Sequence, residues 1–194
     1  MNIIYLHGFQ SSALSIKAQQ LKQYIGQQPV YTLHVPDLNL PPQQVLADLC
    51  HLIEQLHDVV LVGSSLGGFY ATQLVAKYRM PAVLINPAMR PWQLFQDLFG
   101  LEQIPYPVNP YWTLDQLQLD HLAQMAVPFV QDADKILLLL QQGDEVLDYR
   151  EAERYYSAAQ HHALIMLEPH GNHAMDNFAD KIPMILEFLS SSLK

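Results

Sequence analysis

One ten-residue segment constrains the fold more than any other part of the chain. Residues 59–68 read Val-Val-Leu-Val-Gly-Ser-Ser-Leu-Gly-Gly, so an apolar run leads directly into Gly-x-Ser-x-Gly and then into a segment with helical spacing. A strand, turn and helix in this order place Ser65 at a sharp turn. Gly63 and Gly67 stand where larger side chains would collide with neighbouring backbone. The pattern predicts a nucleophile elbow that exposes the Ser65 hydroxyl at a strand end.

The alternative for this segment is an ordinary turn in which a serine caps the following helix. A third glycine, Gly68, favours close packing at the helix start, and Ser64 lacks flanking glycines at the required spacing. We therefore prefer a nucleophilic role for Ser65. The helix start would supply backbone donors and a positive dipole end to a developing oxyanion, with the Leu66 N–H as one donor.

Apolar runs and segments with helical spacing alternate along most of the chain. The apolar runs predict buried strands at 3–6, 30–35, 59–62, 82–85, 136–140 and 164–167. The helical spacing predicts helices at 15–24, 42–56, 66–78, 148–159 and 174–193. Together they predict an α/β fold, with one domain over residues 1–194 and a mainly parallel six-stranded sheet that carries helices on both faces.

One long interval breaks this alternation. Residues 87–134 separate the fourth and fifth predicted strands, and several prolines interrupt them. Aromatic, amphipathic turns in this interval predict a helical cap inserted after the fourth strand. Two roles stay open for its aromatic side chains, which could seal the core or line an acyl pocket.

The first predicted strand ends at His7-Gly8-Phe9. Glycine lets backbone N–H groups approach a substrate oxygen, so the Phe9 N–H is the candidate for the second oxyanion donor. His7 could instead be a catalytic base. We expect a histidine fixed at this strand end to orient the loop through its ring nitrogens.

A serine nucleophile needs a base that is itself held by a carboxylate. Asp144, with Glu145 beside it, follows the fifth predicted strand, and His173 follows the sixth and precedes the last helix. Because the carboxyl ends of parallel strands meet at one edge of the sheet, these side chains should lie near Ser65. The chain order serine, aspartate, histidine is typical of this kind of fold.

Neighbouring residues offer alternatives for the acid and the base. Asp148 could be the acid, although with Glu151 three residues later it would form a capping box for a helix. His170 lies nearer the strand than His173 and is interpreted as a loop residue. No cysteine or carboxylate accompanies these histidines at a familiar metal spacing, so no metal site is expected.

Charge and composition limit the partners. The formal net charge is −9, and the ten lysines and arginines are scattered, so nucleic acid is not an expected partner. No apolar run has the length of a membrane span, and the first residues lack the features of a signal peptide. These observations predict no membrane association and a cytoplasmic location. Cys50 is the only cysteine, which excludes an intrachain disulfide.

The motifs together resemble those of the YqiA-like esterase group of short bacterial α/β-hydrolases. The resemblance runs nearly end to end and rests on residues 5–9 with Ser11-Ser12 and Ser15-x-Lys17-Ala18, and on 63–71, 86–88, 143–149 and 171–173. It implies a minimal α/β-hydrolase fold with sheet order 2-1-3-4-5-6 and a triad of Ser65, Asp144 and His173. Gln141 stands where the wider superfamily has glycine, which leaves Asp148 open as the acid.

The expected function is hydrolysis of a carboxylic ester through an acyl-enzyme, with no cofactor. Hydrolysis of an acyl thioester on the same triad is one alternative, and a non-catalytic, ligand-binding protein on this scaffold is another. The expected partner is a small-molecule ester or thioester. Because no basic groove for a nucleotide-bearing acyl carrier is evident, simple esters are favoured.

Overall fold

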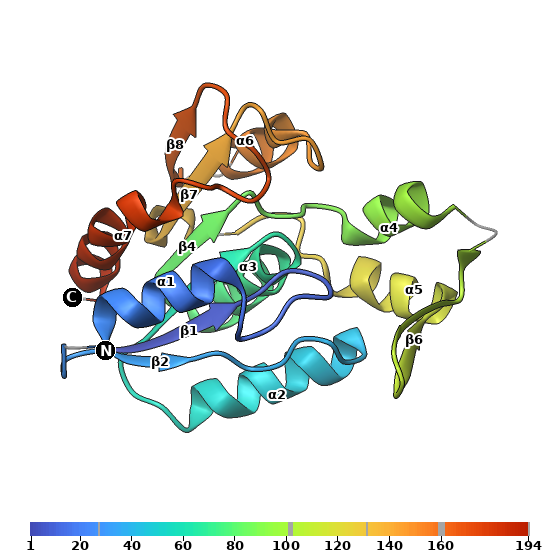
Figure 1. Ribbon diagram of the computed structural model, residues 1–194, viewed down its shortest axis with the longest axis horizontal. Coiled ribbons are helices and arrows are strands. Elements are labelled where there is room, and N and C mark those ends of the chain that lie inside the picture. Colours follow the sequence, from blue (N-terminus) through green and yellow to red (C-terminus); the bar gives the residue numbers. More distant parts are fainter. Residues whose placement is uncertain (27, 101–102, 131, 159–161, 194) are drawn as a thin grey trace.

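A six-stranded parallel sheet forms the centre of the computed structural model (Figure 1), which describes residues 1–26, 28–100, 103–130, 132–158 and 162–193. Its strands are β1 (Asn2–Leu6), β2 (Thr32–His34), β3 (Val59–Ser64), β4 (Ala82–Ile85), β7 (Ile136–Gln141) and β8 (Leu164–Glu168). They lie in the order β2-β1-β3-β4-β7-β8, and each neighbouring pair is parallel. The predicted fold class and the predicted order 2-1-3-4-5-6 are confirmed.

Five helices cover the two faces of this sheet. They are α1 (Ile16–Ile25), α2 (Pro42–Glu54), α3 (Leu66–Tyr78), α6 (Tyr149–Ser157) and α7 (Phe178–Ser192). Alternate residues of β1 enter two separate cores: Ile3 and Tyr5 pack with α1 and α7, whereas Ile4 and Leu6 pack with α2, α3 and α6. With both faces covered, all six residues of β3 are buried. The central strand is therefore a rigid base for the turn that follows it.

Several predicted boundaries differ from those of the structure by one or more residues. The second strand is shorter than 30–35, because the Tyr31 N–H donates to the carbonyl of Gln28 in a turn. The last helix begins at Phe178 rather than at residue 174, because Met175 has a φ of 50° and so leaves the helical conformation. The sixth helix ends at Ser157, and predicted helical residue Ala159 lies outside the described residues.

The interval between β4 and β7 contains α4 (Pro91–Phe99), an antiparallel pair of strands, β5 (Tyr106–Asn109) and β6 (Trp112–Leu114), and α5 (Gln116–Met125). A short 3-10 turn, η2 (Ala133–Lys135), precedes β7. The insertion after the fourth strand thus contains helices as predicted, together with a pair of short strands that the sequence did not predict. The Asn109 carboxamide closes the hairpin by accepting hydrogen bonds from the N–H groups of Tyr111 and Trp112 at 2.8 and 3.1 Å. Figure 1 shows α4, α5 and β6 together at one end of the molecule.

Within the described ranges, no helix has both the length and the apolar character that a membrane span requires.

Candidate active site

Ser65 sits in a strained turn between β3 and α3. Its backbone has φ 55° and ψ −119°, a region that side chains other than glycine rarely occupy and that costs about 1–3 kcal/mol. Backbone hydrogen bonds fix this conformation. The Ser65 N–H donates to the carbonyl of Ile85, and the Ser65 carbonyl accepts from the N–H groups of Gly68, Phe69 and Ala88, all within 2.9–3.2 Å. The surrounding chain therefore holds Ser65 in a backbone conformation that serine does not favour.

The three glycines of the motif leave no room for a side chain. A Cβ at Gly63 would lie 2.6 Å from the carbonyl oxygen of Gly67, and a Cβ at Gly67 would lie 2.0 Å from the carbonyl oxygen of Leu6. A Cβ at Gly68 would lie 2.6 Å from the Cβ of Pro87. Close approach of β1, β3 and α3 thus depends on these positions.

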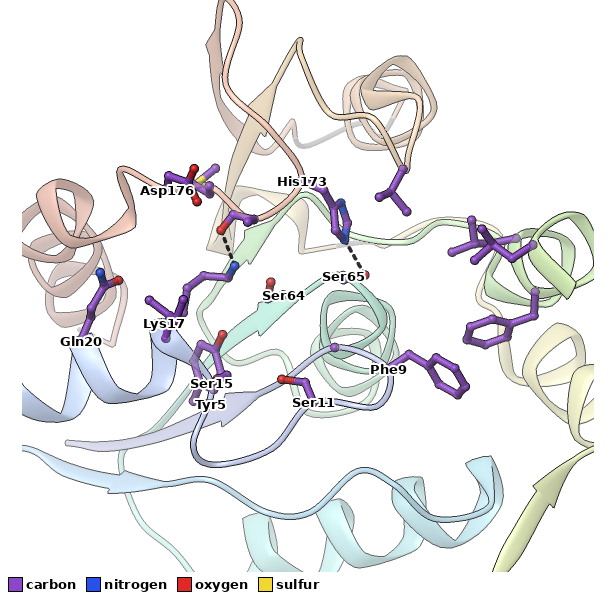
Figure 2. A pocket seen from close by; sticks show the side chains of 18 residues that line it. Tyr5, Phe9, Ser11, Ser15, Lys17, Gln20, Ser64, Ser65, His173 and Asp176 are labelled. Atoms are coloured by element: carbon purple, nitrogen blue, oxygen red, sulfur yellow. Dashed lines mark hydrogen bonds between the residues drawn. The ribbon is translucent and has the colours of Figure 1, made fainter. Parts of the chain in front are cut away.

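A chain of hydrogen bonds joins Ser65 to His173 and Asp144. The Ser65 Oγ lies 3.0 Å from His173 Nε2, and His173 Nδ1 lies 2.8 Å from Asp144 Oδ2. A dashed line in Figure 2 marks the bond between Ser65 and His173. The other oxygen of Asp144 accepts from the N–H groups of Val146 and Leu147, both at 2.8 Å. Because the ionised carboxylate only accepts, it assigns the imidazole proton to Nδ1 and leaves Nε2 to accept the serine proton.

The structure brings Asp144, and not Asp148, to His173. Asp148 caps α6 by accepting from the Arg150 N–H at 3.0 Å, which is the capping role that its sequence position suggested. His170 adopts a left-handed conformation with φ 65°, and its carbonyl accepts from the Gly143 N–H at 2.8 Å. It therefore helps to join the two loops that carry the acid and the base.

Two side chains that the sequence analysis did not assign hold the backbone of His173. Glu145 accepts from the His173 N–H at 3.0 Å. Asn86, which is buried, donates from Nδ2 to the carbonyls of Asn172 and His173, both at 3.2 Å, and its Oδ1 accepts from the Gln141 N–H. The only sequence feature that could have identified Asn86 as a supporting residue is its position at the end of β4, next to Pro87.

Gln141 extends this support to the start of α7. Its Oε1 accepts from the Asn172 N–H at 2.8 Å, and its Nε2 donates to Glu168 and Asn177. Lys181 forms an ion pair with Glu168 and holds the pKa of that carboxyl below its usual value. The residue that replaces the expected glycine is thus the buried centre of a partly exposed polar network that supports the His173 loop.

His7 orients the loop that follows β1. Its side chain is fully buried; Nδ1 lies 2.8 Å from the Gly8 carbonyl and Nε2 accepts from the Leu38 N–H at 3.1 Å. Burial lowers the pKa of this imidazole, although the Gly8 carbonyl and Asp37 oppose the shift. A neutral ring with the proton on Nδ1 satisfies both contacts.

Gly8 backs onto the serine. A Cβ at this position would lie 3.4 Å from the Ser65 Cβ and 3.8 Å from its Oγ. Among the described residues, the N–H groups of Phe9 and Leu66 have no acceptor in the protein. Uncommitted backbone donors are what an oxyanion site requires, so the role of these two N–H groups stays a prediction.

A cavity of about 510 Å³ opens at Ser65 and His173 and has two unlike sides. Its apolar side is formed by Phe9, Leu94, Phe95, Leu98 and Val146. The other side is mainly polar, with Tyr5, Ser11, Ser15, Lys17, Gln20 and Asp176 beside the apolar Ile16, Ala174 and Met175. Figure 2 shows Phe9 on one side of Ser65 and Lys17, Ser15 and Tyr5 on the other. The rings of Phe9 and Phe95 have their centroids 4.5 Å apart, so the insertion contributes directly to the apolar side.

No three histidine, cysteine or acidic side chains gather as metal ligands in the described part of the chain. The carboxylates beside His173 are already occupied, because Asp144 and Glu145 accept hydrogen bonds from the imidazole and from backbone N–H groups.

Comparison with known proteins agrees with this architecture. A family model described as an uncharacterised protein family, UPF0227, matches residues 2–190. Mouse alpha/beta hydrolase domain-containing protein 10 has a TM-score of 0.78 at 14% identity, covering 100% of this chain and 90% of that one. The ferulic acid-bound Est1E from Butyrivibrio proteoclasticus has a TM-score of 0.75 at 15% identity, covering 99% and 89%. The esterase Pf2001 from Pyrococcus furiosus has a TM-score of 0.66 at 14% identity, covering 98% and 80%.

Proposed function

This chain belongs to the UPF0227 family, the YqiA-like group that its motifs resembled, and has the α/β-hydrolase fold; from this premise we propose that it is a serine esterase. It would hydrolyse carboxylic esters through an acyl-enzyme on Ser65. The observation that carries the proposal is the hydrogen-bonded chain from Ser65 through His173 to Asp144, at 3.0 and 2.8 Å. Such a chain activates a serine that would otherwise be a poor nucleophile.

In the proposed reaction, His173 Nε2 takes the Ser65 proton as Oγ attacks the ester carbonyl. The carbonyl oxygen becomes an oxyanion that accepts hydrogen bonds from the N–H groups of Phe9 and Leu66. His173 then donates its proton to the departing alkoxide, which leaves an acyl group on Ser65. Asp144 stabilises the imidazolium, and water activated by the same imidazole releases the acid.

The conformation of Ser65 favours an enzyme over a ligand-binding protein. A binding protein has no use for a serine held at φ 55°, because the strain lowers stability and a glycine would avoid it. Strain of this kind is characteristic of catalytic residues.

The cavity fits a small-molecule ester, since its volume of about 510 Å³ lies within the range of ordinary ligand sites. Leu94, Phe95 and Leu98 of α4 line its apolar side, so we propose that residues 87–134 act as a cap within a single domain. Esterases are among the structural relatives, and ferulic acid is the ligand bound in one of them, which supports the ester class. A cytoplasmic location and the lack of a nucleic-acid partner stay predictions.

Labelling with a fluorophosphonate probe tests the proposal. Intact-mass measurement and peptide mapping should find one adduct on Ser65, absent from Ser65→Ala and retained in Ser64→Ala, which removes the neighbouring hydroxyl. Turnover of a panel of acyl esters, with a thioester included, should fall roughly 10⁴-fold or more in Ser65→Ala, because the triad acts as a unit. Near-normal turnover by a folded Ser65→Ala protein would contradict the proposal.

A further inference from the structure

The polar side of the cavity contains a cation that the proposed reaction does not use. Lys17 lies in the first turn of α1 and lines the same cavity as Ser65 and His173. Among the residues that line this cavity, Lys17 alone carries a permanent positive charge. In Figure 2 its ammonium reaches toward the loop that carries His173, across the cavity from Phe9.

The Lys17 ammonium has spare hydrogen-bonding capacity. It donates to the Ala174 carbonyl, and an ammonium has three N–H donors. In the part of the chain that the structure describes, no carboxylate forms an ion pair with it. Burial lowers the pKa of this lysine, and the more distant Asp176 only partly opposes that effect. A half-buried cation without a paired anion is costly, and a bound anion would remove that cost.

The place of Lys17 in its helix does not explain it either. A cation in the first turn of a helix lies at the positive end of the helix dipole, which is unfavourable. Ser15 already caps α1 by accepting from the Ala18 N–H. A neutral or acidic residue at position 17 would therefore stabilise this helix better than lysine does.

Hydroxyl groups line the same side of the cavity as Lys17, together with the Asp176 carboxylate. Ser11 and Ser15 line the polar side of the cavity, and the buried Tyr5 hydroxyl lies beside Ser15 and Ser64. Burial raises the pKa of Tyr5 to about 12, so this group stays a neutral donor. An ammonium with neighbouring hydroxyl donors is a suitable environment for carboxylate or phosphate oxygens.

We propose that the substrate of this enzyme is a two-sided ester, with an apolar group held by the Phe9 side of the cavity and a carboxylate or phosphate bound by Lys17. Ser65 lies between the two sides, so the scissile bond would separate the apolar part from the anionic part. Lys17 is then a specificity-determining residue. The inference rests on the proposed esterase function and narrows its substrate to monoanionic or dianionic esters.

The competing explanation is that Lys17 has only a structural role, in which its hydrogen bond to the Ala174 carbonyl holds α1 against the His173 loop. The two explanations differ in what they predict for substrates. If the role is structural, loss of Lys17 should change the hydrolysis of neutral and anionic esters alike, because it acts on the position of His173. If Lys17 binds an anion, its loss should change the ratio of kcat/KM for the anionic ester to kcat/KM for the neutral ester.

Matched esters measure that ratio in the wild-type enzyme. The butyryl ester of 3-hydroxypropanoate is compared with that of 3-hydroxypropanamide, which has the same shape without the charge. The butyryl ester of ethylene glycol monophosphate tests phosphate against carboxylate, and monobutyl glutarate against butyl 4-carbamoylbutanoate tests the charge on the acid side. We expect kcat/KM for the preferred anionic ester to exceed that of its neutral partner by roughly ten- to a hundredfold, the range of a charge-assisted hydrogen bond.

Variants of two lysines on α1 test whether the preference for anionic esters depends on Lys17. Lys17→Met should lower the anionic-to-neutral ratio by about tenfold or more, and Lys17→Arg should retain most of it. Lys22→Met removes the same charge from an exposed position on α1 and should leave the ratio unchanged. Melting temperatures show whether each variant is folded, and the wild-type ratio remains decisive where Lys17→Met does not fold.

Each outcome decides between the two explanations. A wild-type ratio near one, or equal losses on both esters in Lys17→Met, overturns the anion site while hydrolysis and labelling at Ser65 leave the esterase proposal standing. A wild-type preference that Lys17→Met abolishes supports it. Absence of both turnover and labelling overturns the esterase proposal, and the inference fails with it.

Discussion

The two halves of the candidate site are held in place by different physical means. On the nucleophile side, Gly63, Gly67 and Gly68 allow backbone to pack against backbone, and Ser65 is fixed by hydrogen bonds of its own main chain. On the acid–base side, side chains do this work. His173 is bound by polar groups from two other segments of the chain, the loop after β4 with Asn86 and the loop after β7 with Asp144 and Glu145.

This difference has consequences for how each half tolerates change. The backbone segments at the elbow are in close contact, so any added atom there would force β1, β3 and α3 apart. A network of side chains can lose one member and be held by the others, with a smaller loss of geometry. Substitutions of the glycines on the nucleophile side should therefore affect folding first, and substitutions on the acid–base side should affect turnover first.

The largest expected effect concerns the two aspartates of the acid loop. Asp144→Asn should lower kcat by about 10⁴-fold, because an amide no longer stabilises the imidazolium and permits the wrong tautomer of His173. Asp148→Asn keeps a competent helix cap and should leave kcat within about twofold. Steady-state rates on one ester measure both variants. Equal losses in the two variants, or a larger loss in Asp148→Asn, would reassign the acid.

Gly67→Ala tests the nucleophile side. Its Cβ would meet the Leu6 carbonyl oxygen at 2.0 Å, so we expect a loss of about 3 kcal/mol or more in the free energy of unfolding. Gly8→Ala is the control, because its Cβ would make only ordinary contacts, at 3.4 Å from the Ser65 Cβ and 3.8 Å from the Ser64 carbonyl oxygen. It should change the free energy of unfolding by less than about 1 kcal/mol. Urea denaturation of both variants provides the values. Similar stabilities would show that the elbow is less tightly packed than the structure indicates.

Glu145→Ala tests the acid–base side. Loss of the acceptor for the His173 N–H should reduce kcat by about three- to tenfold, since an exposed hydrogen bond contributes little and Asn86 still holds the loop. Glu145→Gln retains an acceptor oxygen and should restore most of the rate, whereas Glu153→Ala removes a similar charge from α6 as a control. If Glu145→Gln is as slow as Glu145→Ala, the charge matters rather than the hydrogen bond.

The smallest expected effect is a change in the pH dependence of stability from His7. Its pKa is lowered in the folded protein, so the unfolded chain binds the proton more readily. The stability that neutral His7 contributes is fully present above the unfolded pKa of about 6.5 and is lost as the pH falls below it. His7→Gln should reduce this acid sensitivity.

Urea unfolding at about pH 7.5 and about pH 5.5 measures the difference for both proteins. Asp37, whose carboxylate lies 3.9 Å from the His7 ring, is the charged group that opposes the shift. An Asp37→Asn variant should therefore increase the acid sensitivity. An unchanged pH dependence in His7→Gln would show that other groups account for it.

Local patterns were sufficient to predict most of the fold. Strands buried on both faces have continuous apolar runs, and the glycines around Ser65 specify their turn within five residues of chain. The loops after β7 and β8 could be identified because parallel strands end at one edge of the sheet. The choice of Asp144 over Asp148 as the candidate acid followed from the capping pattern at Asp148, and the structure places Asp144 beside His173.

The supporting contacts of Asn86 and Glu145 with the His173 loop could not be predicted. Asn86 and His173 are 87 positions apart, and Glu145 and His173 are 28 apart, so no local pattern relates them. The late start of α7 has the same origin. Helical spacing includes residues 174–177, but the loop is bent by its contacts with Asn86, Glu145 and Lys17.

The left-handed conformation of Ser65 also has a consequence for how sequences of this kind change over time. Glycine would adopt φ 55° without penalty, so selection for thermal tolerance alone would remove the hydroxyl. Stability and activity therefore favour different residues at this position. Laboratory evolution that selects only for thermostability would favour a more stable but inactive protein. A screen on this scaffold must therefore reward turnover at every round.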